Sequence, residues 1–520
     1  MAAPTYTPAT ESIWRMSFAS LFPPRYRDYA LKIGYDRFLL TLVLAFQTLT
    51  SLRLANTAFQ DEALYLYYGH WQRSAWASGT EIFTHPESFF SGAPQLYPVF
   101  GSYLDSVGGL QLARSFSLLC MLSATIAVYW ATRTLFKDEY GPAVPLTAAL
   151  TFSLAAPVIF LGNFATYDAP SFALIAWATA LAIWSATRKK SLWWSLVIGG
   201  LLALAVALKY ASAIQVPITL LLTLLGINDR EYRWRALQRG LLAGLAFIGI
   251  LGVSALTWAR ADLQGLIATT LDRQMRDPTP VLTLVQAIGT WAGVALAIML
   301  IGGIMLLRTR PVLALVLVVG TFIAITYQVA SGDLTSLHKH IALGLIFGAA
   351  LAGIVLGKIS RYRLGPIVIS GALWLVFVTG LAQSRDLYEA WPNTNGLVET
   401  IEPSLEANPY MRTVGDIPEP VQYALRDQSQ PWQWMGTYEG SFSYAGLTGI
   451  EAYQRALADN YFQLAYFNGS SAISAQLMGE MPSYGFEQTA TVESNGSTWT
   501  IWQRFDPNID PADLEEIAAQ

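Results

Sequence analysis

Long apolar runs, separated by short polar segments, fill the first three quarters of this 520-residue chain. A helix needs about 20 apolar residues to cross the hydrocarbon core of a bilayer. Segments of that kind lie at residues 37–55, 112–132, 143–162, 169–187, 192–208, 211–227, 240–259, 284–306, 312–330, 341–357 and 366–383. The pattern therefore predicts eleven membrane-spanning helices. The pair around Lys209 is ambiguous, because residues 192–227 also fit one long broken helix.

The polar segments between these runs carry their charges unevenly. If the N-terminus is cytoplasmic, the inner segments hold 19 of the 32 Lys and Arg residues but only 7 of the 36 acids. Short cytoplasmic loops of membrane proteins are enriched in Lys and Arg. We therefore expect residues 1–36, which lack the features of a signal peptide, to be cytoplasmic. An odd number of spans then makes residues 384–520 extracytoplasmic.

The composition agrees with a multi-pass protein of the cell membrane. Of all residues, 53% are hydrophobic and 13% are charged, whereas a soluble globular protein has about 25% charged residues. An ordinary soluble enzyme is therefore excluded. The net charge of −4 and the many Tyr and Trp residues fit aromatic belts among membrane lipids and not a nucleic-acid-binding protein. The single cysteine, Cys120, excludes an internal disulfide and a Cys-based zinc site.

Residues 384–520 have a different pattern, with no further apolar span and with many acids and prolines. Alternating residues flank the pair Asn495-Gly496, which predicts a β-hairpin. Apolar residues at helical spacing predict an amphipathic helix over residues 451–467. We predict a small C-terminal α/β domain that follows an all-α transmembrane domain, residues 37–383, with a long outer loop at residues 56–111.

The loop 56–111 opens with the adjacent acids Asp61 and Glu62, which a run rich in Tyr and Trp follows. Two carboxylates directly after a membrane exit are suited to general-base catalysis beside the lipid phase. The alternative is structural, because acidic residues in the first turn of a helix interact favourably with the helix dipole. Aromatic residues are also common at the membrane interface without any catalytic role.

Several short motifs, in their order along the chain, resemble those of a known enzyme family. They are Asp61-Glu62 after the first span, an aromatic helix, Tyr97-Pro98, Tyr103-Leu104, Arg114, Asn163 to Asp168, Ala207-Leu208-Lys209 and His338-Lys339-His340. Over residues 35–385 the chain resembles the lipid-carrier-dependent glycosyltransferases of the GT-C superfamily. This superfamily includes the protein O-mannosyltransferases and the aminoarabinose transferases that modify lipid A.

The resemblance implies a GT-C-like fold with about 11 transmembrane helices and a glycosyltransferase activity. The donor would be a sugar on polyprenyl phosphate, and a lipid, protein or glycan on the outer face would accept a hexosyl or pentosyl group. Asp61 matches the acid that deprotonates or orients the acceptor hydroxyl, and Glu62 matches its partner. A carboxylate base opposite a phosphate leaving group favours a single displacement with inversion at the anomeric carbon.

Cationic residues at outer helix ends are the candidates for binding the donor phosphate: Arg114, Lys209, His338, Lys339 and His340. Lys and Arg stabilise a leaving phosphate by charge-assisted hydrogen bonds. Alternatively, these side chains reach toward the lipid headgroups.

The substrate cavity that we expect is lined by Tyr65, His85, Tyr97, Tyr167 and Asp168. The position of Asp168, two residues before Pro170, fits the start of a helix equally well.

The requirement for a divalent metal is open at the level of sequence. Carboxylates and imidazoles bind Mg, Mn or Zn to differing degrees, and Asp61, Glu62, His85 and His340 are the residues that would converge on such an ion. Many relatives carry a His-Pro-Pro-like stretch where this chain has Thr84-His85-Pro86-Glu87. This departure puts the role of His85 in doubt.

The alternative function is that of a polytopic transporter or lipid flippase with an outer accessory domain. Transporters place ionisable residues near the bilayer midplane. Here the centres of the spans are nearly free of charge, and polar residues collect at their outer ends. The pattern favours an enzyme at the membrane interface over a transporter.

Overall fold

The computed structural model describes residues 35–79, 90–141, 143–187, 192–257, 259–260, 265, 267, 278–438 and 442–504. The chain divides into two compact units. The described residues of the first, the membrane unit, are those within 35–54, 90–96 and 111–386. Those of the second, the C-terminal unit, are the ones within 55–79, 97–110 and 387–504. Most of the predicted cytoplasmic segment 1–36 lies outside the described residues.

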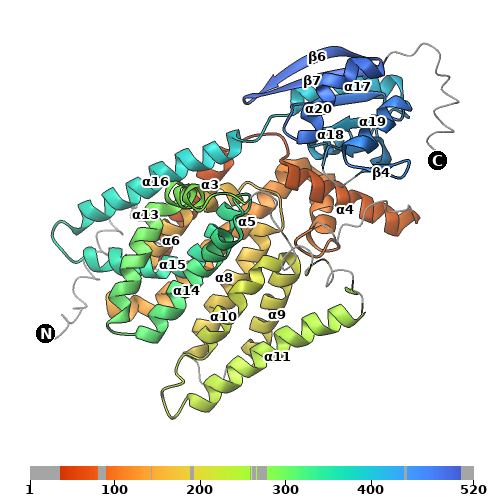
Figure 1. Cartoon of the computed structure of the whole chain (residues 1–520). Helices are drawn as coiled ribbons and strands as arrows, with labels where there is room; N and C mark the ends of the chain where they lie inside the picture. Colours follow the sequence, from red (N-terminus) through yellow and green to blue (C-terminus); the bar gives the residue numbers. More distant parts are fainter. Residues whose placement is uncertain are drawn as a thin grey trace, which may run out of the picture. The chain divides into compact units, whose positions relative to one another are not determined.

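The membrane unit is a bundle of helices (Figure 1). Its elements are α3 (Tyr35–Leu52), α5 (Tyr97–Tyr140, from residue 111 onward), α6 (Ala143–Ser153), α7 (Ala156–Leu161), α8 (Asp168–Ala186), α9 (Trp193–Leu208), η2 (Tyr210–Gln215), α10 (Val216–Thr223), α11 (Arg233–Thr257), α13 (Val281–Leu307), α14 (Pro311–Ser331), α15 (Leu337–Ile359) and α16 (Gly365–Glu389, up to residue 386).

Hydropathy located these helices well. Seven helices in the described part are long and apolar enough to cross a membrane, and each coincides with one of the predicted spans to within two residues at its end or contains it. The other four predicted segments form shorter apolar helices. Segment 143–162 is split into α6 and α7, because Pro157 lacks an N–H for a continuous helix and is suited to the start of a new one. Segment 192–227 is broken at Lys209 into α9 and η2–α10.

Helix α15 lies at the centre of the membrane unit, since its apolar window is completely buried. Glycines let its neighbours approach closely, as is common between membrane helices. A Cβ atom on Gly344 would lie 2.1 Å from the Thr321 carbonyl oxygen of α14, and one on Gly302 of α13 would lie 2.1 Å from the Leu351 carbonyl oxygen of α15. By contrast, only 6% of the apolar window of α11 is buried. We infer that α11 faces lipid.

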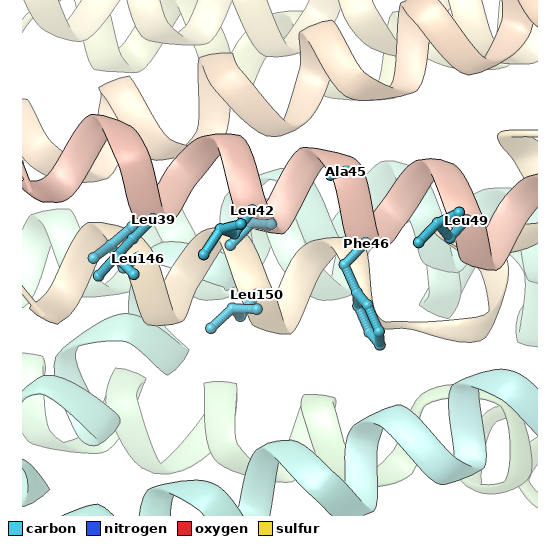
Figure 2. Close-up of a pocket in the computed structure, with 8 residues that line it drawn as sticks. Leu39, Leu42, Ala45, Phe46, Leu49, Leu146 and Leu150 are labelled. Atoms are coloured by element: carbon cyan, nitrogen blue, oxygen red, sulfur yellow. The ribbon is translucent and has the colours of Figure 1, made fainter. Parts of the chain in front are cut away.

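A purely apolar groove of about 510 Å³ runs along α3 beside α6 (Figure 2). It is lined by Leu39, Leu42, Val43, Ala45, Phe46, Leu49, Leu146 and Leu150. Leu42, Phe46 and Leu49 are exposed, which fits contact with lipid chains. The lining has no polar side chain with which to bind a sugar.

The C-terminal unit contains a five-stranded sheet with helices, as the predicted α/β fold requires. Its elements are α4 (Gln60–Ser78), the start of α5, α17 (Asn395–Ala407), β1 (Thr413–Gly415), α18 (Glu419–Ala424), η4 (Pro431–Gln433), β2 (Trp434–Gly436), β3 (Ser443–Tyr444), β4 (Leu447–Thr448), α19 (Ile450–Ala458), β5 (Leu464–Phe467), α20 (Ala472–Glu480), η5 (Met481–Tyr484), β6 (Phe486–Ser494) and β7 (Ser497–Arg504). The strand order is β2-β1-β5-β7-β6, with β2, β1 and β5 parallel and the last two antiparallel.

Two expectations about this unit have different outcomes. The predicted hairpin is confirmed, because β6 and β7 pair up to Ser494 and Ser497 around Asn495 and Gly496, whose φ angles of 44° and 80° suit a tight turn. The single helix predicted over residues 451–467 is wrong. Helix α19 ends at Ala458, and residues 464–467 form the buried strand β5 between β1 and β7. A short, fully buried strand lacks the alternation that would distinguish it from a helix.

Candidate functional site

Three charged side chains meet in the membrane unit where α8 and α15 begin and α9 ends. The Lys209 ammonium donates a hydrogen bond to Oδ1 of the fully buried Asp168. Lys339 Nζ lies 3.6 Å from Asp168 Oδ2, and the Thr166 hydroxyl donates to the same oxygen at 2.7 Å. We call Asp168, Lys209 and Lys339 the lysine pair site. Two of the predicted phosphate-binding residues are therefore close together.

Backbone hydrogen bonds hold Lys209 in position at the end of α9. Lys209 has an extended backbone, with φ −145° and ψ 109°, so α9 ends there and its last carbonyl groups need hydrogen-bond donors from outside the helix. Residues 91–93 supply partners, since Ala93 N donates to Ala207 O at 2.8 Å and Tyr210 N donates to Ser91 O at 2.9 Å. Only glycine fits at position 92, where a Cβ atom would lie 1.9 Å from the Leu208 carbonyl oxygen.

Aromatic rings surround the two ammonium groups. Lys209 Nζ is 5.4 Å from the centroid of the Tyr167 ring, and Lys339 Nζ is 5.0 Å from that of Phe164. Cation–π contacts of this kind stabilise a partly desolvated ammonium group. Of the residues that we predicted to line the cavity, Tyr167 thus contacts the lysine pair site and Asp168 is part of it. Asp168 also begins α8, so both interpretations of this residue agree with its position.

The two histidines beside Lys339 differ in their contacts. His340 Nδ1 is 2.7 Å from Gln328 Oε1. His338 is buried, with its ring edge-on to Phe160 and Trp291 at centroid distances of 4.9 and 5.8 Å. Within the described part of the chain, His338 Nε2 has no hydrogen-bond partner. An imidazole nitrogen that carries its hydrogen can donate a hydrogen bond to a bound anion.

The predicted acids Asp61 and Glu62 lie in the C-terminal unit, in the first turn of α4. Glu62 is fully buried, and its Oε2 accepts a hydrogen bond from Phe59 N at 3.0 Å, so it caps the helix. Glu62 therefore has the structural role that we gave as the alternative, in which an acid stabilises the first turn of a helix. Asp61 is half-buried, and its side chain is more accessible.

The remaining predicted residues are distributed over both units. Tyr65 and Tyr97 are buried in the C-terminal unit, and Arg114 is fully buried on α5 in the membrane unit. His85 lies outside the described residues. The structure thus brings together Lys209, Lys339, Asp168 and Tyr167.

The described residues do not form a metal site. Among them, no three His, Cys, Asp or Glu side chains are placed to hold a metal ion. We therefore derive no step through a metal.

A further buried carboxylate, that of Asp105, is missing from the predicted set. His70 Nε2 lies 2.6 Å from Asp105 Oδ2, Arg426 lies 3.3 Å from the same oxygen, and the Tyr423 hydroxyl donates to Oδ1. Burial and the charge of Asp105 raise the pKa of the Tyr423 phenol. This cluster joins α4, α5 and α18 within the C-terminal unit. No local motif marks it, because its members are far apart in sequence.

Comparisons with known proteins find solved structures of similar fold. No protein-family model matches the chain, and no curated protein matches it. The crystal structure of ArnT from Cupriavidus metallidurans bound to undecaprenyl phosphate matches over 90% of this chain and 98% of that chain, with 14% identity and a TM-score of 0.57.

Two further solved structures are similar in fold. The oligosaccharyltransferase AglB from Archaeoglobus fulgidus, in complex with an inhibitory peptide and a dolichol-phosphate, matches over 92% of this chain and 75% of that chain, with 12% identity and a TM-score of 0.55. The arabinofuranosyltransferase AftD from Mycobacteria matches over 91% of this chain and 40% of that chain, with 15% identity and a TM-score of 0.51.

Proposed function

Since the chain has the fold of the GT-C glycosyltransferases, we propose that it transfers a sugar from a polyprenyl-phosphate donor to an acceptor. The sugar is a hexosyl or pentosyl group, and the acceptor is a lipid, a protein or a glycan. The observation that carries the proposal is the lysine pair site, in which two buried ammonium groups meet at the ends of apolar helices. A lipid phosphate needs such cations at the depth of its headgroup.

At the donor end, Lys209 and Lys339 bind the phosphate and stabilise the charge that develops on it as it leaves. Asp168 holds both ammonium groups in place, and preorganised donors of this kind lower the barrier without reorganisation during the reaction. His338 adds a hydrogen bond from a nitrogen that the described residues leave unpaired. We also assign Arg114 of α5 and His340 of α15 to binding of the donor phosphate.

At the acceptor end, Asp61 takes the proton from the acceptor hydroxyl. The hydroxyl oxygen then bonds to the anomeric carbon while the bond from that carbon to the phosphate oxygen breaks. The electron pair of the broken bond leaves with polyprenyl phosphate. A single displacement of this kind inverts the anomeric configuration. Glu62 acts indirectly, because it fixes the helix turn that presents Asp61.

We place this reaction at the outer face of the cell membrane. The basis is the enrichment of Lys and Arg in one of the two alternating sets of loops, which makes the side of that set cytoplasmic. The candidate site residues belong to the other set. The C-terminal unit, with its loop helices, is then extracytoplasmic, where it meets the acceptor.

The experiment measures sugar transfer and release of polyprenyl phosphate by purified wild-type protein, given a panel of polyprenyl-phosphate sugars and membrane extract, with and without a chelator. We expect Asp61→Asn to lose activity about 100-fold and Lys339→Gln about 100-fold or more. Lys358→Gln is the matched control, because Lys358 is an exposed lysine at the other end of α15.

The outcomes separate enzyme from transporter. If donor lipid crosses the membrane without release of free polyprenyl phosphate, the protein is a transporter or flippase and the proposal fails. If Lys339→Gln and Lys358→Gln are equally active, the lysine pair site does not bind the phosphate.

A further inference from the structure

The turn that precedes Asp61 is held by residues more than 300 positions away in the chain. The Asn56 side-chain amide donates to the carbonyl oxygens of Tyr388 and Trp391, each at 2.9 Å. The Phe59 ring packs against the rings of Tyr388 and Trp391, with centroids 4.9 and 5.5 Å apart. All of these residues belong to the C-terminal unit. The backbone that leads to Asp61 is thus fixed from one side.

A chain of hydrogen bonds fixes the same turn from a second side. Gln60 Nε2 donates to the Tyr438 hydroxyl at 2.7 Å, and this hydroxyl donates to Glu419 Oε2 at 2.8 Å. A phenol has one hydrogen, so its bond to the carboxylate leaves its oxygen to accept from the amide. The donor and the acceptor of each hydrogen bond in this series are therefore determined. Glu419 begins α18, which packs on α4.

The electrostatics connect Glu419 with Asp61. Burial raises the pKa of the Glu419 carboxyl, the hydrogen bond from Tyr438 lowers it, and the negative charge of Asp61 raises it. The geometric link between the two carboxylates is the hydrogen-bond series from Glu419 through Tyr438 to Gln60, the residue that precedes Asp61.

The sheet makes room for this arrangement. Gly436 ends β2, and a Cβ atom there would lie 2.6 Å from the ring of Tyr438. The Tyr438 ring can therefore lie against the strand only because position 436 has no side chain. The close packing of the Tyr438 ring against Gly436 limits where its hydroxyl group can lie.

We propose that Tyr438 and Glu419 are positioning residues that orient the first turn of α4 and direct the Asp61 carboxylate at the acceptor hydroxyl. The inference rests on the proposed function, in which Asp61 is the base. It gives the C-terminal unit a part in the chemical step. Neither residue touches the reacting atoms, so both act through Gln60 and Asp61.

The test compares Tyr438→Phe with Tyr484→Phe in the full chain, each alone and combined with Asp61→Asn. Tyr484 is the matched control, because its hydroxyl also donates to a glutamate, Glu480 at 3.3 Å, in the same unit. We expect Tyr438→Phe to lower kcat about tenfold with little change in KM for the donor, as a misplaced catalytic group does. Tyr484→Phe should change neither constant.

The combined variants supply the second readout. In the Asp61→Asn background, Tyr438→Phe should cause no further loss, because its effect passes through Asp61. An unchanged kcat in Tyr438→Phe, or an equal loss in both backgrounds, overturns the inference.

Amide hydrogen exchange of residues 56–66 checks the positioning directly. Exchange should be faster in Tyr438→Phe than in the wild type and in Tyr484→Phe, and equal rates contradict the inference. A wild type that transfers no sugar contradicts the proposed function instead. Exchange then still decides whether Tyr438 holds the turn.

Discussion

Lys209 combines a structural break with a functional side chain. Its backbone ends α9, and its ammonium group binds Asp168, 41 positions earlier. From the sequence we predicted a cation in apolar surroundings at Lys209 and an acid at the start of a helix at Asp168. Their pairing was not predictable, because no local spacing links residues on two different helices. The same reason hides Glu419 and Tyr438, whose partners Gln60 and Asp61 come from the far end of the chain.

Glu419 gives a prediction about pH. Burial raises the pKa of its carboxyl in the folded state, so the folded protein binds this proton more tightly than the unfolded protein does. Protonation of Glu419 therefore contributes to the free energy of unfolding. This contribution is fully present below the pKa of the unfolded state, about 4.3, and is lost as pH rises through the pKa of the folded state. Glu419→Gln, which still accepts a hydrogen bond from Tyr438, should therefore unfold at a higher temperature than the wild type near pH 7.

Thermal unfolding in detergent between pH 4 and pH 8 measures this difference. The gap between variant and wild type should widen as pH rises. Glu451→Gln, at an exposed position on α19, should follow the wild type throughout. A gap that is constant with pH, or that closes as pH rises, would show that the Glu419 charge does not oppose folding.

At the scale of elements, hydropathy found the helices and the interruption at Lys209, but not the division of segment 143–162 into α6 and α7. Each predicted span corresponds to an apolar helix, because a run of apolar residues is itself the physical requirement for crossing a bilayer. The break at Lys209 depends instead on residues 91–93, which supply backbone hydrogen bonds from another part of the chain. Strand β5 likewise depends on β1 and β7 as neighbours. Such tertiary partners leave no periodic signal.

The break gives a prediction at Gly92. A methyl group there would meet the Leu208 carbonyl oxygen at 1.9 Å, so residues 91–93 and the end of α9 must separate. We expect Gly92→Ala to lower the free energy of unfolding by about 1–3 kcal/mol, as overpacking does, and to reduce sugar transfer through displacement of Lys209. Thermal unfolding and the transfer assay measure the two effects.

Gly249→Ala on α11 is the matched control, because nothing lies within 4 Å of a Cβ atom there. It should be as stable as the wild type or more so, since alanine favours the helix. Equal melting temperatures for Gly92→Ala and Gly249→Ala would argue against a tight contact at the break.

At the scale of the whole molecule, the sequence predicted a helical membrane region and a C-terminal α/β region, and both are present. It did not predict that α4 and the start of α5 belong to the same compact unit as the tail. We had placed residues 56–111 with the membrane domain, because they lie between two spans. Contacts such as those of Asp105 with Tyr423 and Arg426 instead join part of this loop to the tail.

The orientation of the molecule is testable by cysteine labelling. In a Cys120→Ala background, which has no other cysteine, Glu451→Cys and Lys358→Cys each introduce one exposed thiol. A membrane-impermeant maleimide should label Glu451→Cys on intact cells, and Lys358→Cys only after permeabilisation. The opposite pattern would place the C-terminal unit in the cytoplasm.

The composition of the C-terminal unit also limits how hybrids of this protein with its relatives can be built. Residues 55–79, 97–110 and 387–504 share one compact fold although they are separate in the gene. A hybrid that exchanges only the part after residue 387 leaves Asn56, Phe59 and Gln60 against a foreign surface. All three stretches must be transplanted together. Recombination of two genes at a single crossover point is therefore a poor way to obtain a protein that uses a different acceptor. Substitutions in the three stretches of the unit have to be made together.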